Sequence, residues 1–95
     1  MTLQNPQHYS LEYILKSVEQ GFNRYLAKIG SGSEYTFELI GNRIEIKGKI
    51  NKEVQIMINR YNDYEVELMT YTTNLNTNLR HQLAIYLEAI GVKEL

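Results

Sequence analysis

The chain has 95 residues, a formal net charge of −1 and no cysteine. Its length is that of one domain, and the lack of cysteine excludes disulfides, thiolate metal sites and a thiol nucleophile. The charge is unlike the basic surplus of proteins that bind nucleic acid through its phosphates.

Residues 1–8 are polar and contain the chain's one proline, Pro6, so we interpret them as a loose N-terminal leader to the single domain formed by residues 1–95. A helix is predicted to follow, with Ser10 as its N-cap and Gly30 just past its C-terminus. Its apolar residues recur at three- and four-residue steps: Leu11, Ile14, Leu15, Val18, Phe22, Tyr25, Leu26 and Ile29. Gly21 lies on this apolar face, which favours close packing of the helix against a sheet.

Alternation of apolar and polar residues then predicts four strands. Their apolar positions are Tyr35, Phe37 and Leu39; Ile44, Ile46, Gly48 and Ile50; Val54, Ile56 and Ile58; and Tyr64, Val66 and Leu68. The turns are predicted at Gly41–Asn42, at 51–53 and at 61–63. We expect the first and fourth strands to form the sheet edges, where their glutamates discourage strand addition.

These turns predict the pairing register, and a slip of one residue would carry each apolar side chain to the wrong face. The predicted opposite pairs are Phe37 with Ile46, Tyr35 with Gly48, Ile50 with Val54, Ile46 with Ile58, and Ile58 with Val66.

The helical period returns after Thr73 or Asn74, either of which can cap a second helix. The apolar stripe of this helix comprises Leu75, Leu79, Leu83, Tyr86, Leu87 and Ile90. Gly91 is placed to end it, and Val92 to supply the apolar contact of a Schellman motif.

Only one face of the predicted sheet is apolar, so both helices must cover that face. The fold class is therefore α+β: a two-layer sandwich in which a four-stranded antiparallel meander is flanked in sequence by two helices, in the order α-β-β-β-β-α. The other face of the sheet is left open.

This order of elements is similar to that of the double-stranded RNA-binding domain, which runs helix, three strands, helix. That family grips phosphates with a lysine-rich start to its last helix. Here the matching stretch, residues 74–78, is Asn-Leu-Asn-Thr-Asn, and the strands number one more. The resemblance is in topology alone.

The sequence contains no recognisable catalytic or metal-binding pattern. His8 and His81 have no partner at ligand spacing, and the four serines lie outside the Gly-x-Ser-x-Gly pattern. One row of polar residues is predicted across the open face: Glu38, Glu45, Asn59 and Glu65. An open sheet face offers neither the cleft nor the apolar pocket that an acid–base carboxyl pair needs. We therefore expect a protein that is not an enzyme and has no metal or cofactor.

We expect this protein to lie in the cytoplasm. Its start lacks the basic and apolar segments of a signal peptide. No apolar run approaches the roughly 20 residues of a membrane span.

The open face is the predicted functional surface, with predicted rows Lys47–Met57–Glu67 and Lys49–Gln55–Met69. Its expected partner-binding residues are the anchors Met57, Met69, Tyr61 and Tyr71 and the orienting charges Lys47, Glu65 and Glu67. The expected role is that of an adaptor, an inhibitor or an assembly subunit, of the kind found in phage and mobile elements. The partner is another protein or, in the simplest version, a second copy joined face to face.

Two further sequence features bear on binding. Ile85 and Tyr13 lie off the main helical stripes and are predicted to be additional exposed apolar contacts. The alternative function is nucleic-acid binding through Arg43, Lys47 and Lys49 on the sheet face, with Tyr61 as a stacking ring.

Overall fold

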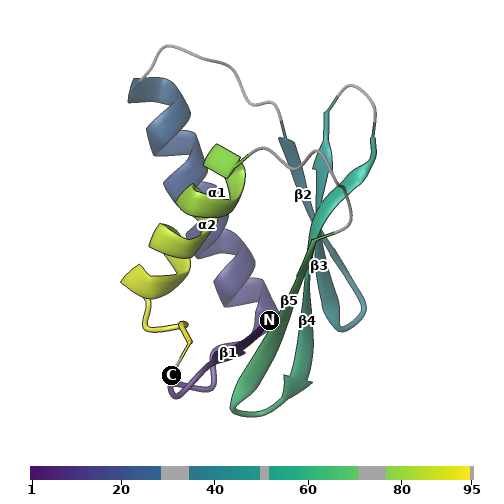
Figure 1. The fold of residues 1–95 in the computed structure, drawn as a ribbon, viewed down its shortest axis with the longest axis vertical. Coiled ribbons are helices and arrows are strands. Elements are labelled where there is room, and N and C mark those ends of the chain that lie inside the picture. The colour runs from purple at the N-terminus through teal and green to yellow at the C-terminus, as the bar shows by residue number, and fades with distance from the viewer. Residues whose placement is uncertain (29–34, 50–51, 71–76, 95) are drawn as a thin grey trace.

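The two-layer architecture is confirmed in the computed structural model, which describes residues 1–28, 35–49, 52–70 and 77–94. The elements are β1 (Thr2–Gln4), α1 (Leu11–Lys28), β2 (Tyr35–Ile40), β3 (Arg43–Gly48), β4 (Val54–Asn62), β5 (Glu65–Thr70) and α2 (Thr77–Ala89). The strands form one antiparallel sheet in the order β1-β5-β4-β3-β2. Both helices lie on the same side of it (Figure 1).

The core lies between the helices and the face of the sheet predicted to be apolar. Its buried side chains from the sheet are Leu3, Ile44, Ile46, Ile56, Ile58, Val66 and Leu68. Those from the helices and the C-terminal turn are Leu11, Ile14, Val18, Phe22, Leu79, Leu83, Leu87 and Val92. The two periodicities therefore identified the buried face of both helices and of the predicted strands, except that Tyr64 lies in the turn before β5 and is 58% exposed.

Helix α1 begins as predicted, because the Oγ of Ser10 accepts a hydrogen bond from the N–H of Tyr13 at 3.1 Å. Helix α2 ends in the predicted Schellman motif. Gly91 has a φ of +83°, and the N–H of Val92 donates to the carbonyl of Leu87 at 2.9 Å. The predicted caps Gly30, Thr73 and Asn74, like Leu75 on the second stripe, lie outside the described residues.

Gly21 lies where helix α1 approaches helix α2 closely. A Cβ atom at this position would lie 2.6 Å from the Cγ and Cδ1 atoms of Tyr86 on α2. The ring of Phe22 packs edge-on against the same tyrosine, with centroids 5.1 Å apart. The expectation that Gly21 packs against the sheet is wrong, because its neighbour is the other helix.

The first hairpin has the predicted register, in which Phe37 is opposite Ile46 and Tyr35 is opposite Gly48. The other two hairpins are displaced by two residues. Ile46 pairs with Ile56 instead of Ile58, and Ile58 pairs with Leu68 instead of Val66. Ile50, predicted to be opposite Val54, lies outside the described residues, and Val54 pairs with Lys47.

The displacement arises because the hairpins close on other residues than predicted, with Gly48 bonded to Glu53 and Asn62 paired with Glu65, and the parity is kept by two β-bulges. One lies between Ile46 and Lys47 and the other between Arg60 and Asn62. In the third hairpin, a two-residue turn at Asp63–Tyr64 and one bulged residue replace the predicted three-residue loop. The observed two-residue turn plus one bulged residue and the predicted three-residue loop both leave an odd number of residues unpaired. The same side chains therefore face the core, although each pairs with a different partner.

The segment interpreted as a loose leader contains a fifth strand, β1. Leu3 is buried and pairs with Val66 on β5, so β5 is not a sheet edge and the edges are β1 and β2. The outer side of β1 is joined to the C-terminal segment, because Gln4 and Lys93 exchange backbone hydrogen bonds of 2.8 and 3.3 Å. A three-residue strand with one apolar residue has no period for sequence analysis to detect.

Candidate functional site

The open face is the side of the sheet turned away from both helices (Figure 1). Its observed rows are Glu38–Glu45–Met57–Met69 and Arg43–Asn59–Glu67–Thr2. Of the predicted rows, only the Glu38–Glu45 pair is confirmed. The rest are wrong: Lys47–Met57–Glu67, Lys49–Gln55–Met69 and the continuation of Glu38–Glu45 to Asn59 and Glu65. The cause is the two-residue displacement of the second and third hairpins.

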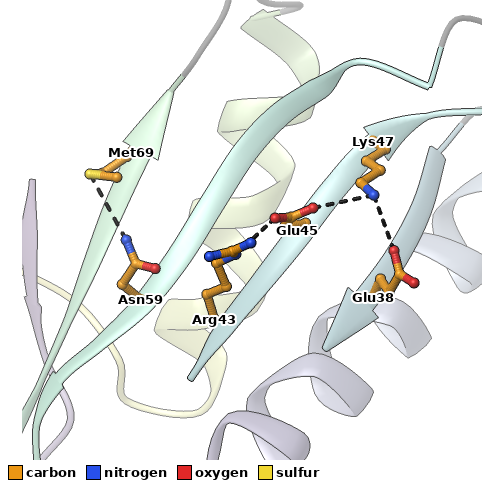
Figure 2. Close-up of polar contacts among 6 residues, drawn as sticks. All are labelled: Glu38, Arg43, Glu45, Lys47, Asn59 and Met69. Atoms are coloured by element: carbon orange, nitrogen blue, oxygen red, sulfur yellow. Dashed lines mark hydrogen bonds and ion pairs between the residues drawn. The ribbon is translucent and has the colours of Figure 1, made fainter. Parts of the chain in front are cut away.

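A chain of ion pairs crosses β2 and β3 on this face (Figure 2). The Nζ of Lys47 lies 3.2 Å from a carboxylate oxygen of Glu38 and 3.2 Å from one of Glu45. The Nε of Arg43 donates to the other oxygen of Glu45 at 2.8 Å. Arg43 and Lys47, the two cations predicted on this half of the face, are therefore paired with glutamates of the same face.

Glu45 is at the centre of this chain, and its side chain is only 7% exposed. No described helix or strand covers this face, and the side chains of Arg43 and Lys47 lie against the carboxylate. Desolvation of the carboxylate by burial is the largest single effect on the pKa of Glu45, and it raises that pKa. The hydrogen bonds and charges of Arg43 and Lys47 together outweigh it, so the pKa of Glu45 is lowered. The hydrogen bonds to Glu38 and Glu45 raise the pKa of Lys47.

The lowered pKa predicts how Glu45 contributes to stability as a function of pH. Its ionised form stabilises the fold above the ordinary glutamate pKa of 4.5, and this contribution is lost as pH falls through the lower pKa of the folded state. We expect Glu45→Gln to be less stable than the wild type near pH 7, with the gap closing as the pH falls below 4.5 and through the lowered pKa of the folded state. Urea unfolding across this range measures the gap.

Glu94→Gln is the matched control, because Glu94 is exposed and forms no ion pair with a described residue. A Glu45→Gln stability gap that stays constant down to the acid limit would contradict the assignment.

Met57 and Met69 are direct cross-strand partners between β4 and β5, and both are half-buried. The amide Nδ2 of Asn59 lies 4.0 Å from the Sδ of Met69 (Figure 2). The structure thus places the two predicted anchors side by side in the middle of the open face. Their thioethers form an adaptable apolar patch.

Glu65 and Glu67 lie on the β5 side of this patch, two residues apart on one face. Glu65 accepts hydrogen bonds from the side-chain amides of Gln4 at 3.3 Å and Asn62 at 2.9 Å. Neither glutamate forms an ion pair with any residue in the described part of the chain. The open face therefore has a neutralised half on β2 and β3 and an acidic half on β5.

The remaining predicted residues are more scattered. Tyr61 is 67% exposed and is the bulged residue near the β4–β5 turn. Lys49 is exposed just after β3, at the opposite end of the sheet. Tyr71 lies outside the described residues. Tyr13 and Ile85 are exposed as predicted, at 45% and 43%, but they lie on the helical layer.

Two features of the described residues bear on enzymatic or metal-dependent function. His8 and His81 are exposed, and no cluster of three or more metal-ligating side chains occurs among the residues that the structure describes. A hollow of about 340 Å³ opens beside α2 and β1. Leu3, Leu68 and Leu87 line its wall, and exposed charged side chains form its rim.

No helix in the described ranges is long and apolar enough to cross a membrane.

Comparison with known proteins found no similar chain: no family model matches, and neither the curated proteins nor the solved structures contain a significant match. The site must therefore be interpreted from its own geometry.

Proposed function

We propose that this chain is a protein-interaction domain that docks a partner on its open sheet face. The observation that carries the proposal is the Met57–Met69 pair, which lies half-buried between an ion-paired half and an acidic half of that face. An apolar centre bordered by charges is the usual anatomy of a protein interface.

The charge distribution favours a particular kind of partner. Glu38 and Glu45 are neutralised by cations within the chain, whereas among the described residues Glu65 has only neutral hydrogen-bond donors and Glu67 forms no ion pair. A partner that places an apolar side chain on the methionines and lysine or arginine beside β5 would complement both features. Such rim charges mainly set association rate and orientation. The role is that of an adaptor, an inhibitor or an assembly subunit.

The nucleic-acid alternative has weaker support from the same geometry. Arg43 and Lys47 are engaged by glutamates and Lys49 lies at the far end of the sheet from Tyr61. Phosphates would have to compete with Glu38 and Glu45 for these cations. A face-to-face homodimer is also less favoured, because it would bring the unpaired glutamates of two copies onto the same interface.

The test is the double variant Met57→Asp/Met69→Asp, which places two carboxylates in the apolar centre of the face. Immobilised wild type is expected to retain a partner from a lysate of the source cell, and the double variant is expected to lose it by at least about tenfold. Quantitative mass spectrometry of the retained proteins measures the loss.

Asn23→Asp is the control, since it adds a carboxylate at an exposed position on the helical layer. Far-ultraviolet circular dichroism and urea unfolding verify that each variant is folded. A folded double variant that retains the same proteins as the wild type would refute the proposal.

A further inference from the structure

The two edges of the sheet differ in how they are protected. The edge strand β1 has three residues, and the C-terminal segment bridges it through Lys93. The other edge, β2, has six residues, Tyr35–Ile40, and its pairing with β3 is regular throughout. It has no proline, lysine or bulge, which are the usual devices against strand addition.

The backbone of β2 presents hydrogen-bonding groups outward at alternate residues. The two-residue turn at Gly41–Asn42 makes Ile40 and Arg43 a hydrogen-bonded pair, because such a turn closes on the residues that flank it. Ile40, Glu38 and Thr36 therefore direct their backbone N–H and C=O groups to β3. The alternate residues Phe37 and Leu39 direct these groups away from the sheet.

Apolar surface also continues over this edge. The side chain of Leu39 is 40% exposed although it belongs to the helix-facing side of the sheet. Helix α1 covers β2, and its Phe22 packs against Phe37 with ring centroids 5.4 Å apart. At about 3.6 residues per turn, the half-buried Leu15 and Leu26 lie on the flank of α1 opposite Gly21, away from α2.

Charge does not oppose pairing at β2. Glu38 is the sole charged residue of this strand, and Lys47 lies 3.2 Å from it. The expectation from sequence that edge glutamates discourage strand addition therefore does not apply here: one of the two strands is covered by β1, and the glutamate of the other is ion-paired.

We propose that a second copy of this chain adds its β2 antiparallel to β2, so that one continuous sheet runs through both copies. A two-fold axis at Phe37 puts the outward backbone groups of Phe37 opposite those of the same residue in the second copy. Leu39 then faces Tyr35 of the second copy, and Thr36 faces Glu38, to which its hydroxyl can donate. Centring the axis on Glu38 would instead oppose two carboxylates directly.

This dimer is independent of the proposed function, because it uses a sheet edge and leaves the open face of each copy uncovered. The first test is the mass of the full chain in solution across a range of concentrations, by sedimentation equilibrium. The wild type is expected to approach twice the monomer mass of 11.1 kDa. Leu39→Pro, which removes an outward N–H, is expected to stay at the monomer mass, whereas Leu39→Thr, which keeps that N–H, retains dimer.

A wild type that remains at the monomer mass at the highest concentration would overturn the dimer. So would a folded Leu39→Pro variant that dimerises as well as the wild type. If Met57→Asp/Met69→Asp abolishes the dimer and Leu39→Pro does not, the open face is the site of self-association and the edge proposal fails.

The register has a separate test, because the chain contains no cysteine. Thr36→Cys and Glu38→Cys variants are oxidised alone and as an equal mixture. The proposed register places the two substituted positions directly opposite, at the short Cα separation of a non-hydrogen-bonded pair. The mixture is expected to form at least about tenfold more disulfide dimer than either variant alone. Preferential cross-linking of Glu38→Cys with itself would refute the register.

Discussion

Replacing Leu83 with alanine is expected to destabilise the fold by about 2–5 kcal/mol. Leu83 is fully buried at the middle of α2 and belongs to the single core that joins both helices to the sheet. The substitution removes the transfer free energy of the side chain and leaves a cavity. A domain of this size has a total stability of roughly 5–14 kcal/mol, so the loss is large. Urea unfolding followed by circular dichroism measures it.

Ile85→Ala is the matched control, because Ile85 lies two residues away on the same helix and is 43% exposed. It removes a similar amount of aliphatic side chain, yet its expected cost is below about 1 kcal/mol. Equal effects of the two substitutions would show that the buried face of α2 is assigned wrongly.

Replacing Asn5 with alanine is expected to cost about 2–4 kcal/mol, since the residue is 2% exposed and holds two hydrogen bonds. Its Oδ1 accepts from the N–H of Tyr9 at 3.1 Å, and its Nδ2 donates to the carbonyl of Tyr9 at 3.0 Å. Its own N–H donates to the carbonyl of Tyr64 at 2.6 Å. Asn5 thus ties the end of β1 to the β4–β5 turn and to the segment that leads into α1.

This substitution should also loosen β1 locally. The N–H of Leu68 donates to the carbonyl of Met1 at 2.8 Å, so its hydrogen exchange reports the attachment of the N-terminal segment. We expect this amide to exchange faster in Asn5→Ala than in the wild type. Asn23→Ala, at an exposed position on α1, is the control. Unchanged stability and exchange in Asn5→Ala would contradict the role given to Asn5.

For the candidate site, the sequence correctly placed Met57 and Met69 on the open face but could not place them opposite each other. Met57 and Met69 are opposite each other because Tyr61 is bulged out of the β4–β5 hairpin. The bulged hairpin and the predicted three-residue loop put the same residues on each face, so the sequence pattern cannot distinguish them. The pairing of Lys47 with Glu45 follows from the strand period, because the two residues lie two apart on one face of β3, and Glu38 is brought to Lys47 by the first hairpin, whose register was predicted correctly. Asn5 was missed because its burial depends on the docking of β1 onto β5, although its side chain bonds locally to Tyr9.

What the sequence by itself determined is local and periodic: two amphipathic helices, the cap at Ser10 and the end at Gly91, the alternating faces of the strands, and the tight turn at Gly41–Asn42. These follow from the chain's own geometry over a few residues, so they can be inferred without knowing the neighbours. The tertiary structure alone decided the short strand β1, the bulged registers and the contact of Gly21 with Tyr86. Strand β1 and the Gly21–Tyr86 contact depend on segments distant in the chain. The hairpin registers depend on a choice among pairings of the same parity, all of which bury the same apolar face.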